Sequence, residues 1–209
     1  MPPAAVAFDF NGTLSDDEPL LARIYCELFA AYRPLSEEAY YLQLAGRTEE
    51  AIFEHWLGRT DPKLIVERID LYCRRARDGS TVTAEARSAV AFAADRVPVA
   101  VVSSAFRREI DVVVDAAGLA NALTLVVSRE DVERGKPDPE CYVQAAARLG
   151  VDPSGLLVFE DTEAGVSAAK AAGCYVVALT RTMEPARLRA ADELAEQIDT
   201  PLVERLLCS

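Results

Sequence analysis

Charged and hydroxyl side chains stand directly after three apolar stretches of the chain. Each stretch predicts a buried strand, because it is continuously apolar and ends in a turn signal or a polar residue. In an open α/β sheet, ligands bind beyond the carboxyl ends of the strands, so residues far apart in sequence converge on one crevice. The residues at these ends are Asp9 after 4–8, Ser103 after 97–102, and Glu160 and Asp161 after 156–159.

Lys136, in the loop of residues 134–139, is a further candidate for the same crevice. The net charge of −12 repels anionic substrates at long range, so a phosphate site must be made locally positive by a metal, a lysine or an arginine. Each candidate also has a purely structural interpretation. Ser103 and Asp161 are suitable helix caps, and Lys136 is a suitable solvated loop residue.

The dipeptide Asn11-Gly12 turns the chain immediately after Asp9. Gly12 allows a tight, left-handed backbone path into the crevice. Taken alone, Asn-Gly is also a good β-hairpin turn. The segments that follow decide between the two interpretations.

Apolar stretches alternate with helical patterns over most of the chain, which predicts a parallel sheet covered on both faces. We therefore expect a Rossmann-like α/β core. The tail from Glu184 onward is expected to be helical and to pack on the outside. The expected strands are residues 4–8, 97–102, 123–127, 156–159 and 175–179, and the expected helices are 83–95, 107–117, 138–150 and 163–172.

Four short helical patterns joined by short loops interrupt this alternation. They predict a small helical bundle, which we interpret as an inserted four-helix cap domain. The expected division is a core of residues 1–15 and 81–209 and a cap of residues 16–80.

Composition narrows the function classes. An acidic protein lacks the basic surface that nucleic acid needs, and no run of about 18 apolar residues is present to span a membrane. The N-terminus lacks the basic and then apolar order of a signal peptide, so we expect a cytoplasmic protein. The five cysteines form no C-x-x-C pair, which disfavours a zinc or redox site. Nothing suggests an assembly larger than a monomer.

Residues 9–14 resemble the first signature of the haloacid dehalogenase-like hydrolase superfamily, D-x-D-G-T-[LV]. The second motif, an apolar strand ending in Ser or Thr, matches Ser103. The third is a lysine and matches Lys136, and the fourth is an acidic pair that matches Glu160 and Asp161. The resemblance covers nearly the whole chain. It is greatest to the helical-cap branch that contains β-phosphoglucomutase and phosphoglycolate phosphatase.

This resemblance implies phosphoryl transfer, in which Asp9 attacks phosphorus and forms an aspartyl-phosphate. It also implies Mg²⁺ as cofactor and a small phosphorylated substrate. Ser103 and Lys136 would bind phosphate, and Lys136 would also orient Asp9. Gly12, Thr13, Ser104 and Arg47, the last in a cap loop, are further expected substrate contacts. The implied metal ligands are Asp9, the backbone carbonyl of Asn11, and Asp161, supported by Glu160.

The chain departs from the signature at Asn11, where the family has its second aspartate. That aspartate protonates the leaving oxygen and then deprotonates the attacking water, and a carboxamide does neither. Loss of a general acid–base costs about 10²–10⁴-fold in rate. Three hypotheses follow: substrates with good leaving groups such as acyl phosphates, a slow enzyme or phosphate-ester binding protein, or an engineered position.

Single residues or pairs argue against three alternatives to a phosphohydrolase. Leu21 lies near the position where sugar-phosphate mutases have a histidine, which disfavours a mutase. The pair Glu160 and Asp161 disfavours a metal-independent dehalogenase. The only cap lysine, Lys63, lies outside the loop around Gly46, which disfavours a phosphonate-cleaving enzyme. His55 is expected to serve packing or to lie at the surface, and Arg107 and Arg108 are expected either to add positive field near the site or to be solvated.

Overall fold

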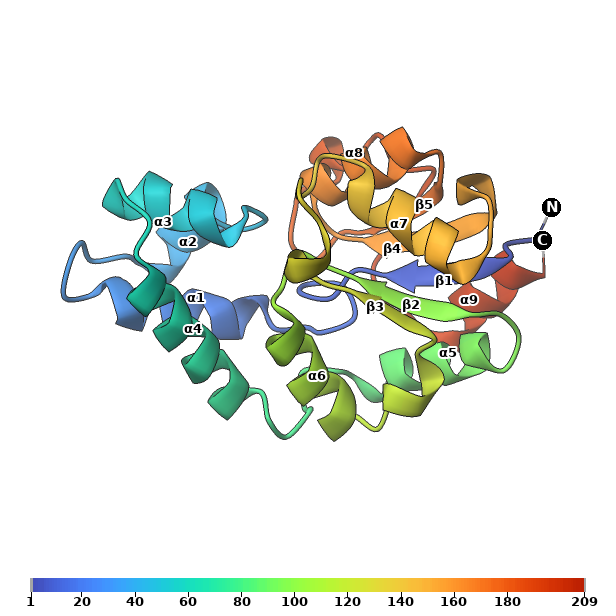
Figure 1. The fold of residues 1–209 in the computed structure, drawn as a ribbon, viewed down its shortest axis with the longest axis horizontal. Helices are drawn as coiled ribbons and strands as arrows, with labels where there is room; N and C mark the ends of the chain where they lie inside the picture. The colour runs from blue at the N-terminus through green and yellow to red at the C-terminus, as the bar shows by residue number, and fades with distance from the viewer. Residues whose placement is uncertain (1, 209) are drawn as a thin grey trace.

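A parallel sheet of six strands forms the centre of the computed structural model, which describes residues 2–208 (Figure 1). The strand order is β3-β2-β1-β4-β5-β6, and every neighbouring pair is parallel. Because β1 lies between β2 and β4, Asp9, Ser103 and Glu160 lie at the carboxyl ends of three adjacent strands. The strands are β1 (Ala5–Phe8), β2 (Val99–Val102), β3 (Leu125–Val127), β4 (Leu156–Glu160), β5 (Tyr175–Leu179) and β6 (Glu193–Ala195).

Helices cover both faces of the sheet, which explains why its central strands are apolar throughout. Alternate residues of β1 enter two different clusters: Val6 and Phe8 pack with α5, α6 and α9, whereas Ala5 and Ala7 pack with α7 and α8. The two helical layers lie on opposite sides of the strands (Figure 1). These helices are α5 (Ala84–Ala94), α6 (Arg107–Ala116), α7 (Glu140–Leu149), α8 (Glu163–Ala172) and α9 (Thr200–Leu207).

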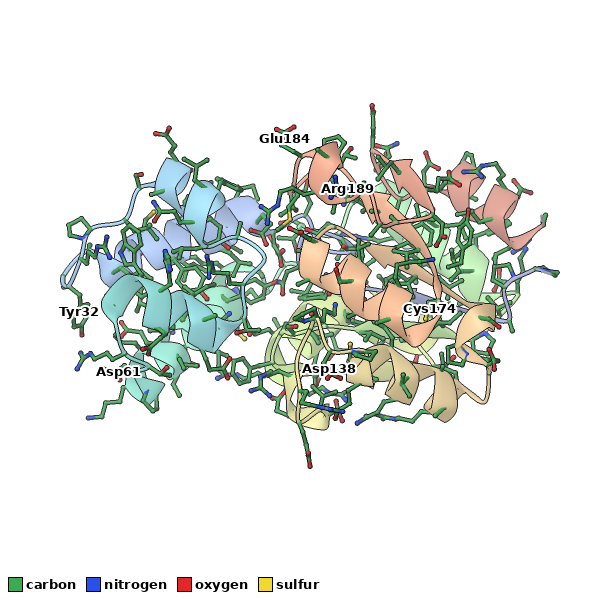
Figure 2. The ribbon with its side chains drawn as sticks, turned by 90° about the horizontal axis from the view of Figure 1, so that it is seen from above. Tyr32, Asp61, Asp138, Cys174, Glu184 and Arg189 are labelled. Atoms are coloured by element: carbon green, nitrogen blue, oxygen red, sulfur yellow. The ribbon has the colours of Figure 1, made fainter. Side chains whose placement is uncertain are left out.

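The helical cap, defined here as α1–α4, lies to one side of the sheet (Figure 1). The side-chain oxygens of Ser36, Thr48 and Asp61 accept backbone N–H groups at the starts of α2, α3 and α4. In Figure 2, Tyr32 and Asp61 lie at the end of the cap away from the sheet. The cap helices are α1 (Glu18–Phe29), α2 (Glu37–Gln43), α3 (Glu49–Leu57) and α4 (Pro62–Arg75).

The two segments that join the cap to the sheet are hydrogen-bonded to each other. Asp16 N donates to Thr81 O at 2.8 Å, and Ser15 Oγ donates to Thr81 Oγ1 at 2.8 Å. The chain therefore leaves and re-enters the core at one point. This junction holds the start of α1 close to the turn that follows Asp9.

The prediction of a wholly helical tail is wrong in one part. The tail contains a 3₁₀ turn (Pro185–Arg187) and the edge strand β6 before α9 begins. β6 has only three residues, two of which are glutamate and alanine, so its sequence lacks the β-branched pattern of a strand. Pairing with β5 overrides that weak propensity. The final helix is as expected and packs against α5 through Val203, Leu206 and Leu207.

Candidate active site

A cavity opens where the carboxyl ends of β1 and β2 face the helical cap. Its volume is about 110 Å³, which suits a small ligand. Residues from the core loops and from α1, α3 and α4 share its wall. The residues on this wall that the sequence predicts as site residues are Asp9, Asn11, Arg47, Ser103, Ser104 and Lys136.

Lys136 connects the acidic residues that follow β1 and end β4. Its ammonium group donates to Asp9 Oδ1 at 2.6 Å, to Glu160 Oε1 at 2.5 Å and to Val102 O at 3.1 Å. The lysine side chain is only 7% exposed, so it is not a solvated loop residue. The ammonium group therefore fixes the orientation of the Asp9 carboxylate at the cavity wall.

Glu160 is completely buried and both of its oxygens are occupied. Tyr142 OH donates to Oε1 at 2.8 Å, and the backbone N–H of Asp161 donates to Oε2 at 3.0 Å. Gly165 makes this arrangement possible, because a Cβ at that position would lie 1.8 Å from Glu160 Oε1. Glu160 therefore serves as an anchor for Lys136.

Asp161 is also completely buried, but one of its oxygens has no partner. Oδ1 accepts a hydrogen bond from Thr13 Oγ1 at 3.1 Å, whereas Oδ2 has no hydrogen-bond partner within residues 2–208. Gly12 has a φ of +73° and faces this oxygen: a Cβ there would lie 2.0 Å from Asp161 Oδ2. Asp161 does not cap α8, since Thr162 does so. An unpaired buried carboxylate oxygen is costly and calls for a ligand.

The donor set fits a divalent cation with a preference for oxygen. Asp9, Glu160 and Asp161 each offer an oxygen within 4.8 Å of the others, and all three are buried. Three carboxylates face one ammonium group, so negative charge is in excess. Hard carboxylate oxygens are the ligands that Mg²⁺ prefers. Since Glu160 is already saturated, the free oxygens of Asp9 and Asp161 are the better candidates.

Burial shifts the titration of this cluster. Loss of hydration raises the pKa of Asp9 to about 7; Lys136 opposes the shift and Glu160 adds to it. Burial, together with the charges of Asp9 and Glu160, raises the pKa of Asp161 well above its ordinary value. Burial also disfavours the charged form of Lys136, but Asp9 and Glu160 outweigh it and raise the pKa of the lysine.

The side chain of Asn11 is engaged by a second buried carboxylate, which sequence reasoning missed. Asn11 Nδ2 donates to Asp17 Oδ2 at 2.8 Å, and the Tyr72 hydroxyl donates to the same oxygen. Gly12 N donates to Asp17 Oδ1 at 3.2 Å. Burial raises the pKa of Asp17 to about 6, although these donors oppose the shift. The carboxamide is thus the partner of an acid rather than a free group.

Several predicted site residues have contacts that the sequence did not predict. Gly12 and Thr13 are not on the cavity wall, and the Thr13 hydroxyl is used by Asp161. Arg47 is exposed on the wall, and its Nε donates to Gln43 O at 2.6 Å. Ser103 is buried on the wall and its Oγ accepts from Ala105 N at 3.1 Å, so it does not cap α6.

His55 and the two arginines at the start of α6 lie away from the cavity wall. His55 is exposed on α3. Arg107 donates to Val126 O at 2.9 Å and lies 3.3 Å from Asp131. Arg108 is exposed and pairs with Asp70 at 2.6 Å. Neither arginine is on the cavity wall, so neither contacts a ligand there.

The cap contributes charged residues to the wall that the sequence analysis did not select. Glu18 is buried at the start of α1 and accepts a hydrogen bond from Tyr40 OH at 3.1 Å. Arg68 of α4 lies between Glu49 and Glu109, with Nη2 2.8 Å from Glu49 Oε2 and 3.0 Å from Glu109 Oε2. A usable signal existed, because Arg68 shares the buried face of α4 with Leu64 and Tyr72 at four-residue spacing.

A model of haloacid dehalogenase-like hydrolases matches residues 3–173 of the chain. The chain belongs to this family. The match spans all four motifs and shows that the chain is a hydrolase of this family. The helical cap described above is consistent with its helical-cap branch. The expected fold and the expected family are therefore both confirmed.

Individual relatives support the same assignment. The chain is 32% identical over 197 residues to validoxylamine A 7'-phosphate phosphatase of Streptomyces hygroscopicus subsp. limoneus, covering 91% of this chain and 92% of the relative. It is 29% identical to hexitol phosphatase A of Escherichia coli, covering 92% and 90%. A solved family IA hydrolase from Entamoeba histolytica superposes with a TM-score of 0.82 at 27% identity, covering 98% and 99%.

Replacing Gly12 tests the fit of the metal site. Gly12→Ala is expected to displace Asp161 and weaken Mg²⁺ binding by about 10–100-fold, as loss of a supporting contact typically does. The matched control is Gly150→Ala, because Gly150 has a similar φ of +72° and open space around it. The control is expected to lose about 1 kcal/mol of stability and to keep its Mg²⁺ affinity. Calorimetric Mg²⁺ titration decides; equal affinity in both variants would contradict the assignment.

The raised pKa of Asp9 predicts that Mg²⁺ binding depends on pH. Asp9 is protonated below about pH 7, and a proton on the carboxylate competes with the cation. Apparent Mg²⁺ affinity should therefore fall by about tenfold from about pH 8 to about pH 6, and binding at the lower pH should release protons. Calorimetry in buffers of different ionisation enthalpy measures both quantities, with circular dichroism as a control for folding. Equal affinity and no proton release would show that Asp9 is not a ligand.

Proposed function

We propose that this hydrolase is a Mg²⁺-dependent phosphohydrolase that acts on a small phosphorylated metabolite through an aspartyl-phosphate on Asp9. The observation that carries the proposal is the position of the Asp9 carboxylate on the cavity wall, held by Lys136 at 2.6 Å, beside a buried Asp161 oxygen without a partner. This arrangement combines a fixed nucleophile with the charge neutralisation that attack on an anionic phosphate requires.

In the proposed reaction, an Asp9 oxygen forms a bond to phosphorus while the bond from phosphorus to the leaving oxygen breaks. Water then attacks the acyl phosphate and releases inorganic phosphate, which regenerates Asp9. Lys136 orients the nucleophile, and Ser103 and Ser104 are on the wall where phosphate oxygens would bind. Asp9, Asp161 and the Asn11 carbonyl would hold Mg²⁺, which supplies positive charge to the phosphate when bound.

Asn11 sets a limit on this chemistry, because its amide cannot exchange a proton with the leaving oxygen. Its Nδ2 is also committed to Asp17. The proposal therefore favours substrates whose leaving group needs little protonation, such as acyl phosphates. The same contact favours a second candidate function, a slow or inert relative that binds phosphate esters.

The names of the relatives support a carbohydrate-like substrate, since they are phosphatases of validoxylamine A 7'-phosphate and of hexitol phosphates. A mutase is less well supported. Leu21 contributes an apolar side chain to the cavity wall, where a mutase would need a proton-transferring group. A metal-independent dehalogenase is disfavoured by the excess of buried carboxylates around Asp9.

The proposal includes the division into a core of residues 1–15 and 81–209 and a cap of residues 16–80. It also includes a monomeric cytoplasmic protein without a nucleic-acid partner. The net charge of −12 supports the last point. Each helix within residues 2–208 is too short or too polar to cross a membrane.

Phosphate release in the presence of Mg²⁺ tests the proposed function directly. The wild-type protein should release phosphate from acetyl phosphate, and chelation of Mg²⁺ should abolish the release. Asp9→Ala should reduce turnover by at least about 10⁴-fold, because the nucleophile is lost. The matched control is Asp16→Ala, whose side chain is about half exposed and does not line the cavity. Turnover that survives in Asp9→Ala would refute the mechanism.

An exchange of residues 11 and 17 tests the role of the amide. Asn11→Asp alone places a partly buried carboxylate in hydrogen-bond contact with the buried carboxylate of Asp17, so one of the two must hold a proton. The double variant Asn11→Asp/Asp17→Asn keeps the donor–acceptor pair and the net charge. We expect the double variant to turn over sugar phosphates about 10²–10⁴-fold faster than wild type, and Asn11→Asp alone to gain less.

Phosphate release and urea unfolding of both variants check this expectation, with Asp17→Asn as the control that adds no carboxylate at residue 11. A wild type as fast as the double variant would mean that the enzyme is adapted to Asn11.

A further inference from the structure

The amide of Asn11 leaves the proposed reaction without its usual proton donor for the leaving oxygen. In phosphoryl transfer the attacking and leaving oxygens lie roughly in line through phosphorus. If Asp9 attacks from the core side of the cavity, the leaving oxygen faces away from Asp9, toward the part of the wall that the cap supplies. The acids on that part of the wall are therefore placed to reach the leaving oxygen.

Most ionisable groups near this part of the wall cannot supply a proton readily. Nη2 of Arg68 lies 2.8 Å from Glu49 Oε2, and both terminal nitrogens of Arg68 donate to Glu109, so these two acids are stabilised in their charged forms. Burial raises the pKa of Tyr25 and of Tyr40 well above the ordinary value. Arginine side chains keep their protons in proteins.

Glu18 differs from these groups in its partners. It is 8% exposed, it lies on the cavity wall, and within residues 2–208 it forms no ion pair. Tyr40 OH donates to Glu18 Oε2 at 3.1 Å, whereas Oε1 accepts no hydrogen bond from the described part of the chain. A buried carboxylate oxygen without a donor is unfavourable, and a proton on that oxygen removes the cost. Oε1 is therefore the atom that can carry a proton to a ligand.

The start of α1 places Glu18 beside the turn that carries residue 11. Its neighbour Asp17 accepts hydrogen bonds from Asn11 Nδ2 at 2.8 Å and from Gly12 N at 3.2 Å. Consecutive Cα atoms are about 3.8 Å apart, so Glu18 stays close to this turn. Glu18 and Asn11 both line the cavity, whose volume is about 110 Å³. The cavity is small enough for one leaving oxygen to lie near both side chains.

The surroundings of Glu18 favour its neutral form. Burial raises the pKa of Glu18 to about 8; the charges of Asp17 and Asp9 add to the shift, and the hydrogen bond from Tyr40 opposes it. The carboxyl is therefore largely protonated near neutral pH, as a general acid must be. The ionisable groups that face it are Asp17 at the start of α1, Tyr40 and Tyr41 of α2, Asp9 after β1 and Asp161 after β4.

We propose that Glu18 is a catalytic residue that takes over, in part, the proton transfers of the missing aspartate and so extends the activity from acyl phosphates to phosphate esters. The inference rests on the proposed function, because it assumes that Asp9 attacks phosphorus. It concerns the leaving oxygen, which the amide of Asn11 cannot protonate.

The two proposed steps return Glu18 to its starting state. In the first, an Asp9 oxygen bonds to phosphorus, the bond to the leaving oxygen breaks with its electron pair, and the proton on Glu18 Oε1 moves to that oxygen. In the second, the oxygen of a water attacks phosphorus while the Glu18 carboxylate takes a proton from that water. The bond between Asp9 and phosphorus then breaks, so Asp9 is regenerated and Glu18 is protonated again.

Removal of the acid in two backgrounds tests the proposal, with ethyl phosphate as the probe. Glu18→Gln keeps the size of the side chain but holds no transferable proton, so kcat/KM should fall at least about tenfold in the wild-type background. In the Asn11→Asp/Asp17→Asn background, the carboxylate at residue 11 can protonate the leaving oxygen. The same change should then cost less than about threefold.

A role of Glu18 in folding or in substrate binding alone would cost the same factor in both backgrounds. Equal losses therefore overturn the proposal. The matched control is Glu38→Gln, because Glu38 is exposed on α2 away from the cavity, and it should leave kcat/KM unchanged.

Two esters that differ in the acidity of their alcohol test the proton transfer itself. Ethyl phosphate and trifluoroethyl phosphate are similar in size, but trifluoroethanol is the stronger acid and leaves with less protonation. Release of the alcohol is the first irreversible step, so kcat/KM reports on it. The ratio of kcat/KM for the trifluoroethyl ester to that for the ethyl ester should rise about fivefold or more in Glu18→Gln. An unchanged ratio overturns the proposal.

The pH dependence of the wild-type protein gives a test that needs no variant. kcat/KM for ethyl phosphate should fall as pH rises through about 8, because deprotonated Glu18 has no proton to donate. The trifluoroethyl ester should show a smaller fall, and circular dichroism over the same range controls for unfolding. Identical profiles for the two esters overturn the proposal.

Acetyl phosphate separates failure of this inference from failure of the proposed function, because its leaving group needs little protonation. If the wild-type protein releases phosphate from acetyl phosphate but from neither ester, the proposed function holds and the role of Glu18 is wrong. If it releases phosphate from none of the three probes, the phosphohydrolase assignment is wrong and the inference fails with it.

Discussion

The ammonium group of Lys136 compensates the negative charge that the sheet concentrates at one edge. β1 and β4 are adjacent, so Asp9 and Glu160 necessarily lie close together, and Asp161 follows directly. Three buried carboxylates within 4.8 Å of one another repel strongly in a medium of low polarity. One ammonium group relieves only part of this repulsion. Tyr142 and the backbone N–H of Asp161 stabilise Glu160 further, which leaves Asp9 and Asp161 as the acids that need a ligand.

The same accumulation of charge gives a physical meaning to Asn11. Asp17 and Glu18 are buried beside the turn that carries Asn11, and burial raises the pKa of Glu18 to about 8. A carboxylate at residue 11 would contact Asp17, where an amide donates a hydrogen bond instead. The identity of residue 11 is therefore coupled to that of residue 17. Any account of the missing aspartate must include Asp17, since the two side chains form one hydrogen-bonded unit.

The fold and the motif-bearing residues were accessible from the sequence for a simple reason. Apolar strands that alternate with helices permit few arrangements, and parallel strands bring their carboxyl ends together. The short strand β6 was missed because only its pairing with β5, and not its composition, makes it a strand.

The charged residues that the cap contributes to the cavity wall were missed for a different reason. Helical periodicity identifies apolar faces, but a charged residue on such a face looks like any solvated charge. Arg68 illustrates this limit: its position on the buried face of α4 was readable, whereas its partners come from two other helices. Asp17 and Glu18 stand at the start of a helix, a position that many acidic residues occupy, so the sequence alone gives them no further role. Their contacts with Tyr40 and Asn11 depend on the packing of the cap.

The ion pairs between cap and core differ widely in the free energy that they contribute to stability. Arg108–Asp70 is exposed and Arg129–Glu50 is partly exposed, and solvent-accessible pairs of this kind typically contribute about 0–1 kcal/mol. The Arg68–Glu109 pair is buried, and breaking one partner of a buried pair leaves an uncompensated charge. Arg68 and Glu109 also line the cavity. The position of the cap and the polarity of the cavity therefore depend on the same buried residues, so a change in the cap that moved Arg68 would alter both at once.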